Sequence, residues 1–270
     1  MKEFLKEAIA VALKSGEMIR RHVGKAKDIS FKGAADLVTD VDKRSEALIK
    51  SYLAKKFPTH QFLGEEGGGD RTGCAYRWVV DPIDGTTNFV HDLPYFSVSI
   101  ALESDCKPVL GVVYDPVHNE LFHAVKGGGA FLNKKSIKVS KVKELKQSLL
   151  CTGFAYELKD TRDSNVEHFV DFLLAAQAIR RLGSASLDMC YVACGRFDGY
   201  WEVGLKPWDT AAALIILKEA GGKATKFNGS PYSHYDQEIL VSNGLLHKKM
   251  EDVLMRRRRV RHCKVTFGKY

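Results

Sequence analysis

The sequence predicts an α+β protein whose two closely packed halves meet near residue 145. Three observations predict this class: apolar residues recur at helical spacing near the amino terminus, strands with a period of two fill the middle, and strands alternate with helices beyond residue 145. The 270 residues, 45% hydrophobic and 27% charged, fit one large globular domain or two packed subdomains. A cleft between two such halves is a natural place for a ligand.

Two helices are predicted in the first 60 residues. The first places apolar side chains between Phe4 and Ile19 on one face and ends near Gly24. The second covers about 41–57, and Pro58 closes it because the residue before a proline is disfavoured in helical geometry. The next segments alternate with a period of two or are short apolar runs, which predicts a largely antiparallel sheet with strands near 78–80, 96–102, 109–114, 120–125 and 130–133.

Beyond residue 145 the pattern changes to alternating strands and helices. Strands are expected near Leu149 and over 197–203, with a short β pair near 223–242. Helices are expected over about 163–178, 185–194 and 208–220, and a last helix carries a basic tail. We therefore divide the chain into halves at 1–145 and 146–255, followed by a tail at 256–270, with the halves packed tightly enough to act as one domain.

The formal net charge of +8 is concentrated near the carboxyl end. Residues 248–264 hold eight basic and two acidic side chains, so this segment carries +6 and the rest of the chain only +2. A solvated helix face explains such a run, and contact with a partner, a nucleic acid or a membrane surface is the alternative. The longest apolar runs, such as 211–217, are too short to span a membrane. The mixed charge of the first residues does not fit a signal peptide. The six cysteines form no Cys-x-x-Cys pair, which is typical of a reducing cytoplasm.

The most informative segment is Asp81-Pro-Ile-Asp-Gly-Thr-Thr-Asn-Phe, directly after an apolar strand. Pro82 fixes one backbone torsion and Gly85 allows a steep turn, so Asp81 and Asp84 can converge on one point. The residues after the turn would begin a helix whose first amides can bind an anion. An Asx turn with a helix cap is the purely structural alternative.

Three further acidic segments fit the same chemistry. Gly64-Glu-Glu places Glu65 at a strand end, although a solvated acidic loop would look similar. Asp209 begins a helix and is equally plausible as its N-cap, and Asp40 or Asp42 could cap the second helix. Together, the acidic residues supply enough oxygen ligands for two or three Mg²⁺ ions, and they are Glu65, Asp81, Asp84 and Asp209. Two ions about 4 Å apart would clamp both oxygens of a phosphoryl displacement. No Walker-type P-loop and no Cys-x₅-Arg motif occurs.

These motifs resemble the inositol monophosphatase family in order and spacing over roughly residues 1–250. The matching stretches are Gly64-Glu-Glu, Trp78-Val-Val-Asp-Pro-Ile-Asp-Gly-Thr-Thr-Asn-Phe-Val-His and Trp208-Asp-x-Ala-Ala, supported by Asp36-Leu-Val-Thr-x-x-Asp, Gly183-Ser-Ala-Ser-Leu-Asp-Met-Cys and Gly195-Arg-Phe-Asp-Gly-Tyr-Trp-Glu. The resemblance implies an α-β-α-β-α layered fold, a homodimer and Mg²⁺-dependent, lithium-sensitive hydrolysis of small phosphate monoesters. Ala213 stands where the family usually has glycine, and the segment near 154–165 and the arginine-rich end match poorly.

The resemblance also assigns roles to individual residues. It implies that Glu65, Asp81 and the Ile83 carbonyl bind the activating metal, and that Asp81, Asp84 and Asp209 bind a second. Thr86, supported by Asp42, would orient the attacking water together with Glu65. The amides of Gly85 and Thr86 would receive the phosphate. Finally, Asp84, the Ala185 backbone and Glu202 would face the hydroxyls of the substrate ring.

Three functions follow, in order of preference. The first is a phosphatase for myo-inositol 1-phosphate and related inositol monophosphates in the cytoplasm. The second is a broader sugar phosphatase whose substrates include fructose 1,6-bisphosphate, and binding the second phosphate would need a basic group opposite the metals. Among the possible substrates, 3′-phosphoadenosine 5′-phosphate ranks last. The third is a regulatory protein that binds RNA or a transcription complex through residues 248–264, although no aromatic residues are interleaved among its arginines.

Overall fold

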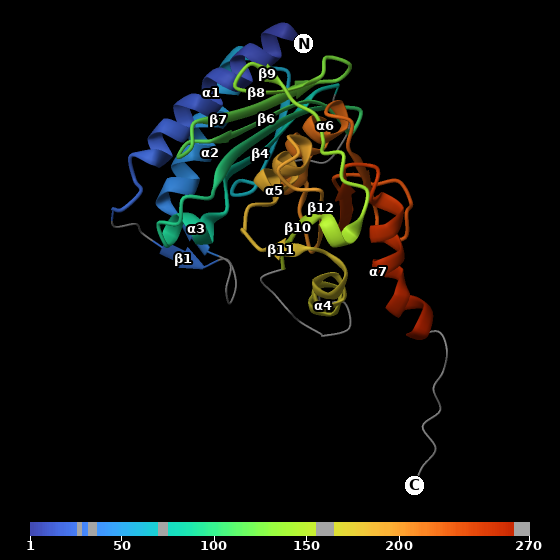
Figure 1. Ribbon diagram of the computed structural model, residues 1–270. Helices are drawn as coiled ribbons and strands as arrows, with labels where there is room; N and C mark the ends of the chain where they lie inside the picture. Colours follow the sequence, from blue (N-terminus) through green and yellow to red (C-terminus); the bar gives the residue numbers. More distant parts are fainter. Residues whose placement is uncertain (26–28, 32–36, 70–74, 155–164, 262–270) are drawn as a thin grey trace.

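Two long helices form the outer layer at the amino-terminal side of the molecule (Figure 1). The computed structural model describes residues 1–25, 29–31, 37–69, 75–154 and 165–261. Helix α1 spans Lys2–Arg20 and helix α2 spans Asp40–Lys56. Both bury their apolar face against the first sheet, and the hydroxyls of Ser15 and Ser45 join the helices through a 2.6 Å hydrogen bond. The two predicted helices are confirmed, with α1 ending earlier than Gly24.

The start of α2 differs in one detail from the sequence expectation. Its N-cap is Thr39, not Asp40 or Asp42, and the Thr39 hydroxyl accepts from the amides of Val41 and Asp42. Asp42 occupies the third helical position, where its carboxylate accepts the Thr39 amide at 2.8 Å and completes a capping box. The capping box therefore fixes the Asp42 side chain at the start of the helix.

A seven-stranded sheet forms the second layer, in the order β3-β4-β5-β6-β7-β8-β9. Every neighbouring pair is antiparallel except β3 and β4, which run parallel, so the predicted largely antiparallel sheet is confirmed. Its strands are β3 (Gln61–Gly64), β4 (Arg77–Asp84), β5 (Ser97–Ser104), β6 (Lys107–Asp115), β7 (Glu120–Val125), β8 (Ala130–Leu132) and β9 (Lys135–Ser136).

Two buried helices separate this sheet from a second one. Helix α5 spans Ala185–Ala193 and helix α6 spans Pro207–Glu219. The run Ala211–Leu217 is buried on all sides because α6 has a sheet on each side of it. Ala213, where the family usually has glycine, is fully buried in this central core.

The second sheet has five strands in the order β11-β10-β12-β14-β13, with parallel and antiparallel neighbours. Its strands are β10 (Leu149–Thr152), β11 (Ala178–Arg180), β12 (Gly199–Val203), β13 (Lys223–Thr225) and β14 (Glu238–Ser242). Helices α4 (Val166–Ala175) and α7 (His247–Arg261) cover its outer face. The expected helix over 163–178 is therefore too long at its carboxyl end, because the chain turns at Ala176 into the edge strand β11.

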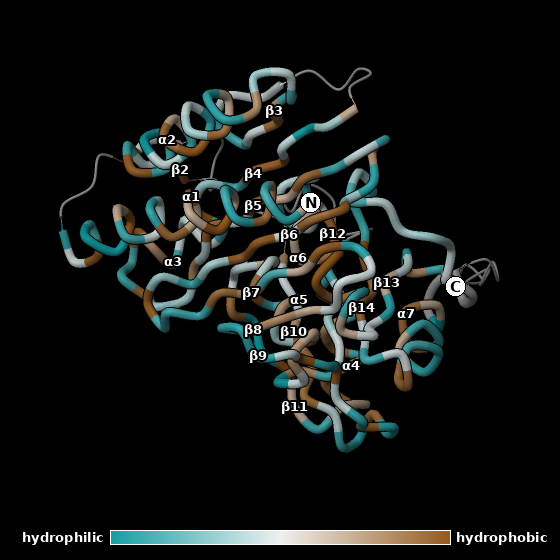
Figure 2. Tube along the Cα trace, turned by 90° about the horizontal axis from the view of Figure 1, so that it is seen from above, coloured by the Kyte–Doolittle hydropathy of each residue, from teal (hydrophilic) through white to brown (hydrophobic). Residues whose placement is uncertain are grey.

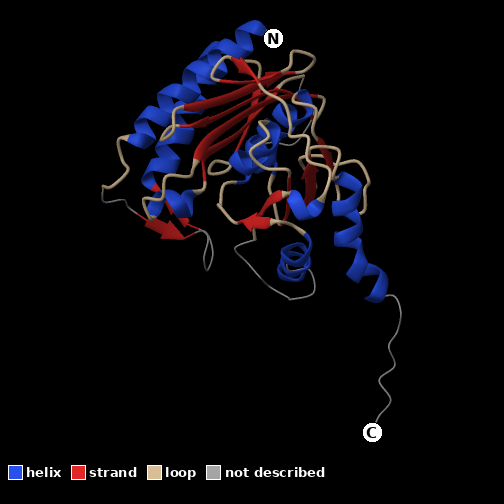
Figure 3. Ribbon diagram, in the orientation of Figure 1, coloured by secondary structure: helices blue, strands red, loops and turns tan. Residues whose placement is uncertain are grey.

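The layers alternate helix, sheet, helix, sheet, helix, which confirms the α-β-α-β-α architecture (Figures 1 and 3). Three apolar clusters fill the spaces between successive layers, and Figure 2 shows the apolar segments gathered around the central strands and helices, with polar segments outside. The short helix α3 (Thr86–Val90) follows the turn at Gly85, where the sequence predicts a helix. The sequence did not predict the hairpin strands β1 (Ile29–Phe31) and β2 (Leu37–Thr39) or the 3₁₀ turn Leu145–Gln147.

Candidate active site

The segment after β4 makes the turn that the sequence predicts. The strand pairing with β5 is interrupted between Asp81 and Asp84, so both carboxyl groups leave the strand at its end. The Asp81 carboxylate accepts the Ile83 amide at 3.0 Å, which closes a tight local turn. Gly85 then takes φ 98°, and a Cβ there would lie 3.0 Å from the Tyr95 carbonyl oxygen, so only glycine fits. Helix α3 starts immediately afterwards, as expected.

Asp84 connects the two halves of the molecule. Its carboxylate accepts the Ser184 hydroxyl at 2.6 Å and the amides of Ala185 and Ser186 at 3.2 and 2.7 Å. These donors lie at the first turn of α5, where the helix dipole also favours a negative charge. The amide of Ala185, expected to face the substrate, is therefore engaged in holding Asp84.

Asp209 and Glu65 approach the same place from other elements. Asp209 is the third residue of α6, not its N-cap, and its carboxylate accepts the Lys206 amide at 2.7 Å. Glu65 follows the end of β3, as the sequence predicts, and its carboxyl group hydrogen bonds to that of Asp81. The parallel pairing of β3 with β4 brings these two strand ends together.

The Thr86 hydroxyl is held at the start of α3. It lies 3.0 Å from a carboxylate oxygen of Asp42 and 2.9 Å from the Ile83 carbonyl oxygen, and it can donate to either. The other carboxylate oxygen of Asp42 is occupied by Thr39, so the capping box of α2 also positions Asp42 toward Thr86. The Thr86 oxygen can also accept a hydrogen bond from a bound water.

One cavity of about 100 Å³ gathers nearly all the predicted site residues. Asp42 is the exception, since it lies behind Thr86 and does not line the cavity. Five lining residues were not predicted as site residues, although Gly183 opens a motif that matches the family and Phe154 begins the segment that matches it poorly: they are Gly153, Phe154, Arg181, Gly183 and Leu205. Asp36 lies outside the described residues. The lining residues that were predicted are Glu65, Asp81, Ile83, Asp84, Gly85, Thr86, Ala185, Glu202 and Asp209.

The carboxyl groups in this cavity repel one another. Burial raises the pKa of Asp81 well above its ordinary value, and the charges of Glu65, Asp84 and Asp209 add to the effect. Burial also raises the pKa of Asp209 well above normal, with Asp84 contributing most among the charges. The pKa of Asp84 is raised by burial too, but the hydrogen bonds from Ser184 and Ser186 oppose the shift.

Glu202 lies on the side of the cavity formed by β12. Burial raises the pKa of Glu202 to about 7. The Tyr200 hydroxyl donates a hydrogen bond that opposes this shift, whereas the charge of Asp84 adds to it. The backbone of Gly153 faces the Glu202 carboxylate so closely that a Cβ at residue 153 would lie 2.1 Å from its oxygen. Glu202 is therefore confined by its neighbours.

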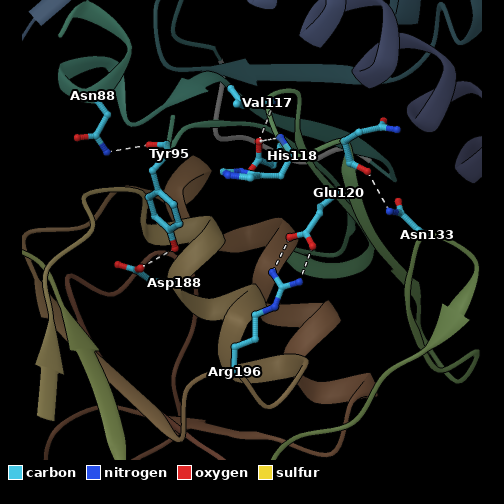
Figure 4. Close-up of polar contacts among 10 residues, drawn as sticks. Asn88, Tyr95, Val117, His118, Glu120, Asn133, Asp188 and Arg196 are labelled. Atoms are coloured by element: carbon cyan, nitrogen blue, oxygen red, sulfur yellow. Dashed lines mark hydrogen bonds and ion pairs between the residues drawn. The ribbon is translucent and has the colours of Figure 1, made fainter. Parts of the chain in front are cut away.

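A chain of hydrogen bonds fixes the loop that enters α5 (Figure 4). The buried Asn88 amide donates to the carbonyls of Tyr95 and Leu182, each at 2.7 Å. The Tyr95 hydroxyl in turn donates to the buried carboxylate of Asp188 at 2.9 Å. The loop before α5 is thus tied to α3 and to the segment before β5, and the two halves meet at the cavity with little freedom.

Comparison with known proteins identifies the family and the architecture. The model of the inositol monophosphatase family matches residues 1–261. The chain belongs to the inositol monophosphatase family. It is similar to an inositol-1-monophosphatase of Synechocystis, 41% identical over 256 residues that cover 94% of this chain and 89% of the relative. A protein of Pseudomonas aeruginosa named Nus factor SuhB is 44% identical over 239 residues, covering 85% of this chain and 88% of the relative. The solved inositol monophosphatase of Anabaena (Nostoc) sp. PCC 7120 superposes with a TM-score of 0.87 at 42% identity, covering 94% and 96% of the two chains.

Members of the inositol monophosphatase family are phosphatases that depend on metal, and the residues of this cavity fit a hard divalent cation. All the candidate ligands are oxygens, and the cavity concentrates acidic groups whose pKa values are raised, first by burial and then by the charges of the neighbouring acids. Within the described ranges, no three Asp, Glu, His or Cys side chains lie close enough to hold a metal ion as they stand.

The basic carboxy-terminal segment lies on the outermost helix, away from the cavity. Lys248 forms ion pairs with Glu251 and Asp252, and Lys249 pairs with Glu144. The side chains of 257–261 and the residues after 261 lie outside the described part of the chain. In the part that the structure describes, no helix has the length and apolar character needed to cross a membrane.

Proposed function

We propose that the protein is a Mg²⁺-dependent phosphomonoesterase that hydrolyses myo-inositol 1-phosphate and related inositol monophosphates to inositol and inorganic phosphate. The observation that carries the proposal is the convergence of four acidic side chains from β3, β4 and α6 on one cavity beside the start of α3. The inositol-1-monophosphatase of Synechocystis supports the choice of substrate.

The acidic groups would hold two or three Mg²⁺ ions. Glu65, Asp81 and the Ile83 carbonyl would bind one ion, and Asp84 and Asp209 would join Asp81 around a second. Bound Mg²⁺ supplies Lewis-acid stabilisation of the phosphate oxygens and lowers the pKa of a coordinated water. The hydrogen bonds from Ser184 and Ser186 favour the ionised form of Asp84 against the effect of burial and fix its orientation, which prepares it as a ligand.

The protein groups around Thr86 would position the attacking water. When the Thr86 hydroxyl donates to Asp42, its oxygen can accept a hydrogen bond from one O–H of the water, and the Glu65 carboxylate can accept a hydrogen bond from the other. Two acceptors fix the direction of the remaining lone pair, which then faces the phosphorus atom. The attacking water is then already held in the reactive geometry, which lowers the entropic cost of the reaction.

Substrate would be held at both ends of the cavity. The amides of Gly85 and Thr86 open α3 and have no acceptor within the helix, so they are suited to the phosphate oxygens. At the other end, Glu202 would accept hydrogen bonds from the ring hydroxyls together with the free edge of Asp84. A polyol ring satisfies these acceptors, whereas an apolar alcohol leaves them unpaired.

Substitution of Asp209 by asparagine tests the proposal. Asp209→Asn keeps the side-chain size and the Lys206 hydrogen bond but removes one ligand charge, so we expect kcat for inositol 1-phosphate with Mg²⁺ to fall at least a hundredfold. The matched control is Asp105→Asn, which removes the same charge in an exposed turn. Phosphate release and urea unfolding are measured for both. Wild-type kcat in Asp209→Asn would refute the proposal.

We infer that the protein acts in the cytoplasm as a homodimer. Cys74 and Cys263 lie outside the described part of the chain. The four cysteines within that part carry no disulfide, which supports a reducing compartment. Helix α4 exposes an apolar stripe of Val166, Val170, Leu173 and Leu174 next to the edge strand β11, and a second copy of the chain would cover it. Light scattering of wild type and Leu174→Lys tests the dimer, which the lysine should weaken.

Two alternatives depend on other parts of the chain. A broader sugar phosphatase needs a basic group near the far end of the cavity. The regulatory function, supported by the name of the Pseudomonas relative, needs free basic side chains, whereas Lys248 and Lys249 are paired with acids. RNA binding measured across salt concentrations, with and without the residues after Leu254, decides it: equal and weak binding by both forms would exclude the tail as an RNA site.

A further inference from the structure

Arg181 is the one basic side chain among the described residues that line the cavity. The other charged groups in the lining are five carboxylic acids. Within the described ranges, the Arg181 guanidinium makes no hydrogen bond or ion pair, although the arginine next to it donates to the Ile179 carbonyl. A guanidinium that lines an acidic cavity with its donors unused is available to a ligand.

The position of Arg181 relative to the cavity follows from its neighbours. Burial raises the pKa of Glu202 and of Asp188, and the charge of Arg181 opposes both shifts, so the guanidinium lies on the side of the cavity formed by β12 and α5. A Cβ built on Gly183 would lie 3.0 Å from its Nη1 atom, which places the side chain folded over that glycine. Gly183 takes φ 90°, a conformation that leaves the space open for the arginine.

The backbone that carries Arg181 is held firmly. Asn88 donates to the carbonyl of Leu182, the next residue, and Asn88 is itself buried in α3, in the other half of the molecule. The side chain of Arg181 is exposed, so its guanidinium can reach the cavity and solvent at once. A group bound by Arg181 would therefore lie at the mouth of the cavity, beyond the ring that contacts Glu202.

We propose that Arg181 is a specificity-determining residue that binds a second anionic group of the substrate, and thereby admits polyol and sugar bisphosphates beside monophosphates. The proposal rests on the proposed function, because it assumes that the scissile phosphate occupies the opposite end near Gly85. Phosphate fits the guanidinium fork through paired N–H donors, and a neutral hydroxyl uses only one of them. Among the charged side chains described in the cavity lining, Arg181 is the one that attracts a second anion.

Kinetics on two substrates test the proposal. Arg181→Met keeps the length of the side chain without its charge, and Arg181→Lys keeps the charge without the fork. We measure kcat and KM for fructose 1,6-bisphosphate and for inositol 1-phosphate with Mg²⁺. In Arg181→Met, KM for the bisphosphate should rise about tenfold or more while kcat/KM for the monophosphate stays within about twofold; Arg181→Lys should lie between. The matched control, Arg180→Met on β11, should change neither substrate.

The outcomes separate this inference from the function on which it rests. An equal loss on both substrates would place Arg181 on the scissile phosphate and overturn the inference, as would unchanged kinetics on both. Hydrolysis of inositol 1-phosphate but not of the bisphosphate by the wild type would also overturn it and leave the proposed function standing. Hydrolysis of neither substrate would refute the proposed function itself. Urea unfolding of each variant checks that the fold is kept.

Discussion

Replacement of Gly111 by alanine should separate α6 from the sheet that supports it. Gly111 lies in the middle of β6, where its Cα faces the backbone of α6. A Cβ at this position would lie 2.2 Å from the Ala212 carbonyl oxygen and 2.6 Å from the Ile215 Cγ2 atom. The nearest obstacle is backbone, so a rotamer change cannot relieve it, and the helix itself has to move.

The size of the effect follows from these distances. Ordinary van der Waals contact needs about 3.4 Å, so α6 must shift by roughly 1 Å, and overpacking of this kind costs about 3 kcal/mol of unfolding free energy. Asp209 lies in the first turn of α6, and a displacement of about 1 Å at a catalytic group can cost about a hundredfold in rate. Gly111→Ala should therefore lower both stability and kcat.

Gly24→Ala is the matched control, since it makes the same chemical change without a clash. Gly24 takes φ 73° and has no atom within 4 Å of the added Cβ, so alanine there costs only the left-handed backbone strain, about 1 kcal/mol. Both variants are unfolded in urea and assayed for phosphate release with Mg²⁺. If Gly111→Ala is no less stable than Gly24→Ala and turns over at the wild-type rate, the close packing of α6 on β6 does not position Asp209.

Two further substitutions test the cavity wall and the stability at low pH. Gly153→Ala would press a methyl group against the Glu202 carboxylate, so we expect KM for inositol 1-phosphate to rise severalfold with kcat within about twofold; a loss confined to kcat would contradict this assignment. Burial lowers the pKa of His247, which hydrogen bonds to Thr225 and Ser242, to about 4. The unfolded chain therefore takes up a proton below about pH 6.5 while the folded chain does not, and stability should fall by about 2–3 kcal/mol between pH 6.5 and 4. In His247→Gln this part of the pH dependence of urea unfolding should disappear, and an unchanged slope would show that another group causes it.

The sequence predicts the fold best where one local pattern decides it. The apolar periodicity of α1 and the period-two strands β5 to β7 need only burial on one or two faces, and they are confirmed with small shifts at their ends. The edge strand β11 was missed because its three residues, Ala178–Arg180, are half-exposed and follow a helix without a glycine or proline between them. Its strand geometry comes from pairing with β10, a contact that no local pattern contains.

The residues of the candidate site also fall into those that a local sequence pattern predicts and those that only tertiary contacts place. Asp81 and Asp84 were predictable because proline and glycine around them fix the turn locally, and the resemblance supplied their partners. Arg181 was not, since an arginine before a leucine and a glycine has no chemical pattern of its own. Its place in the cavity depends on Asn88, nearly a hundred residues earlier, holding the next carbonyl. Specificity of this kind arises from tertiary contacts and becomes visible only in the structure.

Some of the hydrogen bonds that join the two halves also shape the cavity. Asp84 is fastened to the first turn of α5 by Ser184 and Ser186, and Asn88 fastens the loop before that turn to α3. A movement that separated Asp84 from α5 would therefore break the hydrogen bonds that orient its carboxylate. Because the acids around Asp84 already repel each other, these few neutral donors have to hold them in place until a cation is bound. The rigid junction between the halves is thus a requirement of the site, and substrates that demand a wide opening of the cavity are poor candidates.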